Sequence, residues 1–152
     1  MNKIKEIIVS IAIPNIVGVV SAIFSKVKDN FDSFNKPEFT PPGIVFPIVW
    51  SILYILMGIS SYLIYKENTT YKYDALKIYA IQLIINGLWS IIFFRLQWFF
   101  IAFITVILLI VLTIIMIYKF YKINKAAGLL QIPYLIWLIV ALVLSYNVYL
   151  LN

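Results

Sequence analysis

Polar side chains inside one apolar stretch of this sequence, two of them carboxamides, are the residues best suited to orient a bound molecule. Gln82, Asn86 and Ser90 recur at intervals of four, which places them one above another on a single face of a helix. A carboxamide in an apolar interior needs a hydrogen-bonding partner. That partner is either a neighbouring helix or the polar group of a ligand.

Aromatic side chains recur at the same spacing in a second stretch and share a face with small residues in a third. Phe46, Trp50 and Tyr54 follow one another at intervals of four, and Trp137 shares a helix face with Ala141. Such faces suit a flat conjugated guest, because offset stacking adds about 0.5–1.5 kcal/mol per ring pair beyond burial. Three helices with these faces can enclose a mostly apolar ligand cavity. The alternative is that the rings form belts at the membrane surface and the small residues form packing seams.

The residue types of conventional enzymes are missing from the apolar stretches. The sequence contains no cysteine and no histidine, which excludes disulfides, thiol nucleophiles, imidazole bases and the common zinc sites. Its six aspartate and glutamate residues lie at the ends of the apolar stretches or between them, so no carboxylate pair is placed inside for proton transfer. We therefore expect no conventional catalytic residue and no metal ligand, and whether the chain is an enzyme stays open.

The composition identifies a membrane as the solvent that positions these residues. Of 152 residues, 64% are hydrophobic and 12% are charged, whereas about a quarter of a soluble domain is charged. The charges leave five apolar intervals long enough to span a bilayer, which takes about 20 residues, and backbone amides in hydrocarbon require helices. We expect one domain over residues 1–152, an all-α bundle of five transmembrane helices at about 5–25, 44–65, 75–94, 98–121 and 127–150.

Lysine and arginine are distributed unequally between the two ends of the expected helices. Eight lie on the side of the N-terminus and four on the other side, and positively charged loops tend to stay in the cytoplasm. We expect a cytoplasmic N-terminus, with the loop over about 26–43 and the C-terminus outside. The net charge is +6, and because the basic residues flank apolar stretches, their expected partner is membrane lipid and not nucleic acid.

The loop over about 26–43 is stiffened by proline immediately before the second helix. Pro41 and Pro42 are adjacent and cannot lie in a helix interior, whereas Pro47 is tolerated in the first helical turn. A stiff loop beside the mouth of a bundle can act as a lid, because it loses little entropy on closing. Alternatively, the prolines only end one helix and begin the next.

Three segments of the sequence resemble motifs of the TspO/MBR family, which includes tryptophan-rich sensory proteins, translocator proteins and peripheral-type benzodiazepine receptors. "KPEFTPPGIVFPIVWSILYILMG" at 36–58 is similar to the family's K-P-x-W-x-P-P stretch and the V-W-x-x-L-Y-x-x-M-G that follows it. "NGLWSIIFF" at 86–94 is similar to L-N-x-x-W-S-x-x-F-F, and "PYLIWLIVALVLSYNV" at 133–148 to P-Y-x-x-W-x-x-x-A-x-x-L-x-x-N. The three motifs occur in the family's order, and the resemblance extends over nearly the whole chain.

The resemblance implies a five-helix bundle, often a homodimer, with a ligand cavity beneath the first loop. It implies a receptor or sensor that binds porphyrins, such as protoporphyrin IX and haem, and benzodiazepine-site ligands, with no required cofactor. The alternatives are light- and oxygen-dependent porphyrin degradation, which would use Trp50 and Trp137, or transport of tetrapyrroles or other lipophilic ligands. A bacterial cell membrane is the expected location. Phe39 replaces the tryptophan of the family's loop, so an indole N–H is lost there. The implied ligand-binding residues are Gly18, Ala22, Phe46, Trp50, Tyr54, Asn86, Trp89, Ser90, Trp137 and Ala141, and the implied lid residues are Phe39, Pro41 and Pro42.

Overall fold

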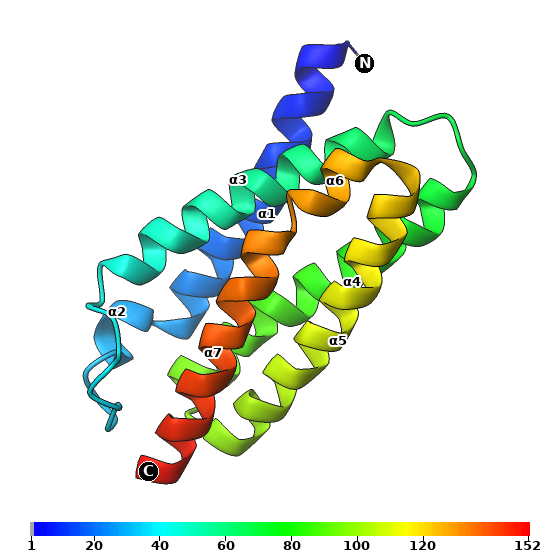
Figure 1. Cartoon of the computed structure of the whole chain (residues 1–152). Helices are drawn as coiled ribbons and strands as arrows, with labels where there is room; N and C mark the ends of the chain where they lie inside the picture. Colours follow the sequence, from blue (N-terminus) through cyan, green and yellow to red (C-terminus); the bar gives the residue numbers. More distant parts are fainter. Residues whose placement is uncertain (1) are drawn as a thin grey trace.

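The computed structural model describes residues 2–152, and all regular structure within them is helical. Five helices are long and apolar enough to cross a membrane, which confirms the expected all-α bundle (Figure 1). The long elements are α1 (Lys3–Ser25), α3 (Val45–Tyr65), α4 (Tyr71–Ser90) with its π-helical continuation η1 (Ile91–Arg95), α5 (Phe99–Ile123) and α7 (Ile132–Leu151). Two short helices, α2 (Val27–Asn30) and α6 (Lys125–Leu129), lie in the connections.

Two helix boundaries differ from those expected. Helix α4 begins at Tyr71 instead of 75, because a helix can continue past the apolar stretch into the headgroup layer, where Asp74 pairs with Lys119 at 2.5 Å. The expected last helix at 127–150 is divided into α6 and α7. Pro133 in the first turn of α7 explains the division, because proline has no N–H to donate and its ring clashes with the preceding turn.

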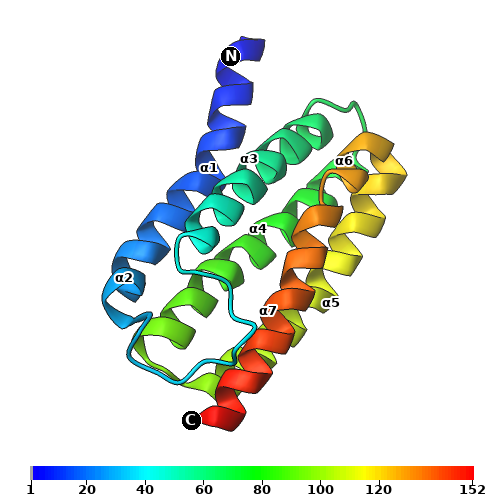
Figure 2. The same cartoon turned by 60° about the vertical axis from the view of Figure 1, so that its left-hand side comes forward.

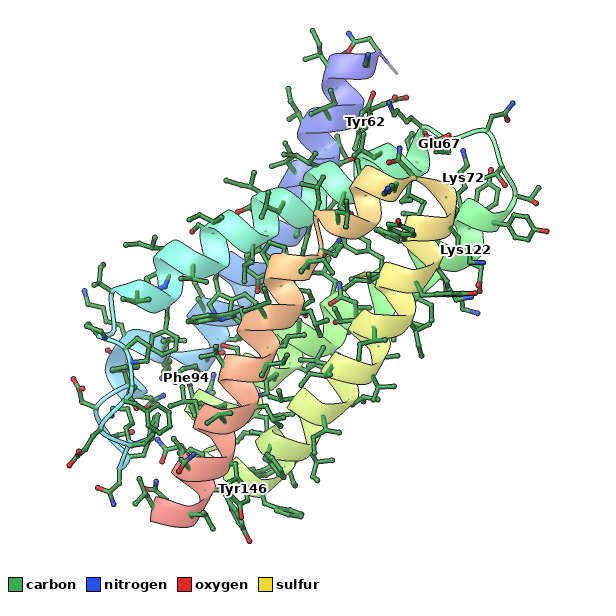
Figure 3. All side chains as sticks on the ribbon, viewed as in Figure 1. Tyr62, Glu67, Lys72, Phe94, Lys122 and Tyr146 are labelled. Atoms are coloured by element: carbon green, nitrogen blue, oxygen red, sulfur yellow. The ribbon has the colours of Figure 1, made fainter. Side chains whose placement is uncertain are left out.

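The helices form a bundle in which α3, α4, α5 and α7 enclose most of the core. Helix α4 packs against α5, to which η1 joins it by a short connection, and α5 packs against α7. Helix α1 packs against α3 and α4, and its N-terminal end stands clear of the other helices (Figures 1 and 2). Figure 3 places Glu67, Lys72 and Lys122 at the end of the bundle far from Phe94. These charged residues therefore lie at one end of the bundle, outside the hydrocarbon, as a membrane requires.

Helices α1 and α3 approach closely at two glycines. A Cβ on Gly58 would collide with the backbone of Ile11 and would lie 2.8 Å from the carbonyl oxygen of Ser10. That carbonyl is four residues before Pro14, which has no N–H to donate to it. Further along, Gly18 lies against the ring of Tyr54. Gly18 of α1 therefore serves the packing of two helices within this chain.

Candidate functional site

A cavity of about 740 Å³ lies between α1, α3 and α4. It is covered by α2 and the loop that follows it, residues 27–44, which we call the lid. This volume falls within the range of about 300–1,000 Å³ that is usual for small-molecule sites. Its lining is mostly apolar, and the charged residues in it are Lys28 and Asp32 at the lid. The cavity therefore suits a hydrophobic ligand with few polar groups.

Eight of the ten residues expected to bind ligand lie in the wall of this cavity. Trp137 and Ala141 are the two that do not. Trp137 stands behind the wall, with its ring centroid 5.8 Å from Phe46 and 6.5 Å from Trp50. Ala141 is buried in α7. The eight in the wall are Gly18, Ala22, Phe46, Trp50, Tyr54, Asn86, Trp89 and Ser90.

Rings from α3 and α4 give the cavity two aromatic surfaces. Trp50 stacks on Tyr54 with centroids 5.4 Å apart and planes 27° apart. Phe46 contacts Phe31 of the lid edge-on at 5.5 Å. On α4, the indole of Trp89 is buried, and its Nε1 has no hydrogen-bond partner in the described part of the chain. A flat apolar guest would therefore meet aromatic rings from α3, from α4 and from the loop residue Phe31.

A chain of buried hydrogen bonds orients the carboxamide of Asn86. The Tyr54 hydroxyl donates to Asn86 Oδ1 at 2.7 Å, and Asn86 Nδ2 donates to the Tyr134 hydroxyl oxygen at 3.0 Å. The Tyr134 hydroxyl donates in turn to Gln82 Oε1 at 2.8 Å. Asn86 and Gln82 thus have partners on other helices, which was one of the two alternatives. Asn86 also lines the cavity and keeps one N–H and one lone pair for a ligand.

The proline-bearing part of the loop lies outside the cavity wall. Pro41 and Pro42 do not line it, and Phe39 is 57% exposed. The lid surface is formed instead by residues near α2 and by the two residues before α3. The loop residues in the wall are Val27, Lys28, Phe31, Asp32, Gly43 and Ile44.

The middle of the loop is fixed to the bundle away from the cavity. The ring of Phe34 is buried, 5.4 Å from the centroid of Phe93 and 5.2 Å from that of Phe99. The backbone N–H of Asn35 donates to Asn152 Oδ1 at 3.1 Å, and Asn152 Nδ2 donates to the Asn35 carbonyl at 2.8 Å. We call Phe34 and Asn35 with these partners the lid anchor. It attaches the loop to η1, α5 and the end of α7.

Several residues of the cavity wall were not predicted from the sequence, and most of them lie on α1 and the lid. On α1, Asn15 and Ala22 frame Gly18 at intervals of three and four, so helical spacing could have extended the predicted face to Asn15. The short helix α2 has no periodicity to detect. The missed residues outside the loop are Asn15, Val19, Ser21, Ile23, Pro47, Ser51 and Phe94.

Comparison with known proteins gives a consistent assignment. Residues 10–151 match the sequence profile of the TspO/MBR family. The chain is 36% identical to "Protein CrtK" of Rhodobacter capsulatus over 89% of this chain and 85% of that protein. It is 36% identical to "Tryptophan-rich protein TspO" of Archaeoglobus fulgidus, over 100% of this chain and 99% of that one.

A vertebrate protein shows the same relationship at slightly lower identity. The "Translocator protein" of Ovis aries is 32% identical over 78% of this chain and 72% of its own length. The matched regions include the helices that form the cavity. With five helices able to span a membrane, the chain is an integral, multi-pass membrane protein, and it belongs to the TspO/MBR family.

Proposed function

We propose that this membrane protein is a receptor or sensor whose ligand is a flat hydrophobic tetrapyrrole, held in the cavity between α1, α3 and α4. The observation that supports this most directly is the cavity itself, which combines stacked rings with an oriented carboxamide beneath a lid. Membership in the TspO/MBR family supports a receptor or sensor role. Benzodiazepine-site ligands, which are also aromatic and largely apolar, would use the same wall.

Protoporphyrin IX suits this lining better than haem. The chain contains no histidine and no cysteine, and these are the usual axial ligands of haem iron along with methionine and tyrosine. Tyr54 is the tyrosine in the wall, and its hydroxyl already donates to Asn86. A porphyrin without iron needs no axial ligand. Its ring needs stacking and burial, which the cavity provides, and its two propionate groups need a polar partner, for which Lys28 is a cation in the wall.

Spectroscopic titration of the purified protein with protoporphyrin IX tests this proposal. Replacing Trp50 by alanine should weaken binding, because it removes a ring from the wall. Trp98→Ala is the matched control, because Trp98 is 54% exposed and lies outside the wall. Equal affinity in both variants, or no saturable binding by the unmodified protein, would contradict the proposal.

A second candidate function is porphyrin degradation in light and oxygen, and the arrangement of rings behind the cavity favours it. Trp50 has its centroid 5.4 Å from Tyr54, 6.2 Å from Tyr134 and 6.5 Å from Trp137. These are oxidisable side chains in contact with one another beside the ligand. Replacing Trp137 by phenylalanine separates the two functions, because it should preserve binding and reduce product formation under illumination.

We further propose that the lid faces the outside of a bacterial cell membrane and that the protein is a homodimer. The lid anchor joins the loop to Asn152, so the loop and the C-terminus are on the same side, opposite the N-terminus. Gly18 does not support a dimer interface, because it packs against Tyr54 of its own chain. Light scattering of the protein in nanodiscs would determine the subunit number.

A further inference from the structure

The cavity wall between α1 and α3 is made of side chains that also face out of the bundle. Val19 and Ile23 of α1 line the cavity and are 60% and 68% exposed. On the other side of this wall, Ile44 is 67% exposed, and Ser51 is exposed as well. Side chains that border a cavity and the lipid at once mark a place where the two are barely separated.

The packing of α1 on α3 explains why this place is weakly closed. The two helices are in close contact at Gly58 with Ile11 and at Gly18 with Tyr54. The antiparallel register that puts Ile11 against Gly58 brings Val19 opposite Ser51 after two helical turns. From there towards the lid, both helices border the cavity, as at Ala22 and Ser51. These two side chains are too small to fill the space between the helices.

The lid, in contrast, is held in place by several contacts on the far side of the loop. The Phe34 ring is buried among aromatic rings of η1 and α5. Asn35 makes three hydrogen bonds with Leu151, the last residue of α7, and with Asn152, which follows it. Gln97 Nε2 also donates to Ser33 Oγ at 2.6 Å. Lifting the lid would break all of these contacts. In the described part of the chain no side-chain hydrogen bond joins α1 to α3, because Ser51 Oγ donates within α3 and Asn15 Nδ2 within α1.

We propose that the ligand enters and leaves the cavity sideways, from the hydrocarbon of the bilayer through the opening between α1 and α3, while the lid stays anchored to α7. This inference rests on the proposed function, because it concerns the route of that ligand. It assigns a role to Val19, Ala22 and Ser51 as the rim of the opening. The ligands it admits are molecules that dissolve in the membrane, and the charged lid residues Lys28 and Asp32 do not act as their entrance.

Cross-linking tests the route, and the absence of cysteine from the chain makes the labelling specific. A Val19→Cys, Ser51→Cys variant is joined by a short bis-maleimide across the opening. An Asn35→Cys, Asn152→Cys variant, joined in the same way, fixes the lid. Each is placed in phosphatidylcholine vesicles containing protoporphyrin IX. Association and dissociation rates are then read from quenching of tryptophan fluorescence before and after cross-linking. The unlinked form of each variant serves as its folding control.

We expect the link between α1 and α3 to slow both rates by about tenfold or more, with a much smaller change in affinity, because a gate affects rates more than equilibrium. Fixing the lid should leave both rates within about twofold of the unlinked form. Unchanged rates after linking α1 to α3 would overturn the proposal, whatever the lid link does. If the cysteine pair prevents folding, Ser51→Phe, which narrows the same opening, is measured instead and must slow exchange. Saturable binding by the unlinked protein tests the proposed function separately.

Discussion

The hydroxyl of Tyr134 is the central group of the buried polar chain, and removing it should destabilise the protein measurably. It accepts a hydrogen bond from Asn86 Nδ2 and donates one to Gln82 Oε1. Tyr134→Phe removes both bonds without changing the shape of the ring. Gln82 Nε2 already has no partner in the described part of the chain, so the whole Gln82 carboxamide would then be buried without a bond.

The expected loss can be estimated from these two bonds. Side-chain hydrogen bonds between transmembrane helices contribute on average about 0.6 kcal/mol each, and leaving a buried polar group unpaired costs about 1–3 kcal/mol. We therefore expect Tyr134→Phe to lower the free energy of unfolding by about 1–3 kcal/mol. Ligand affinity should also fall, because Asn86 loses one of the two bonds that orient it.

Reversible unfolding in mixed micelles, followed by circular dichroism, measures this loss. Tyr146→Phe is the matched control, because Tyr146 is exposed on the same helix and should tolerate the change. The reasoning would be refuted if Tyr134→Phe lost less than about 0.5 kcal/mol, well below the cost of one unpaired group. That result would mean that Gln82 and Asn86 find new partners once the hydroxyl is gone.

Three further predictions concern the cavity, the helix packing and the orientation. Trp50→Ala should weaken protoporphyrin IX binding by about tenfold, since ring stacking and burial together are worth at least about 1.4 kcal/mol, whereas Trp98→Ala should have little effect in the same titration. Gly58→Ala should lower the free energy of unfolding in micelles by about 1–3 kcal/mol, because the added methyl meets backbone atoms of α1. Gly43→Ala is the control, because the atom nearest to its added methyl would be 3.5 Å away. Lys28→Cys should react with a membrane-impermeant maleimide added to whole cells. If the cysteine is not labelled, the proposed orientation is wrong.

The sequence alone determined the number and type of the spanning elements and the family. Hydrocarbon sets the length of each apolar stretch and requires a helix to satisfy its backbone, so the interruptions by charge were sufficient to count the helices. Spacing within one helix was equally informative. Gln82 and Asn86 do share a face, and Trp50 and Tyr54 do stack, because residues four apart are neighbours on any helix.

The tertiary structure decided which of these faces meet. Lipid and bundle interior are both apolar, so hydrophobic periodicity does not tell which side of a transmembrane helix faces inward. The rotation of α7 places Trp137 behind Trp50 and not in the wall, and the rotation of α1 brings Asn15 into it. The path of the lid depends on Phe34 and on the bonds between Asn35 and Asn152. Asn35 and Asn152 are 117 residues apart in the chain, and only the folded bundle brings them together.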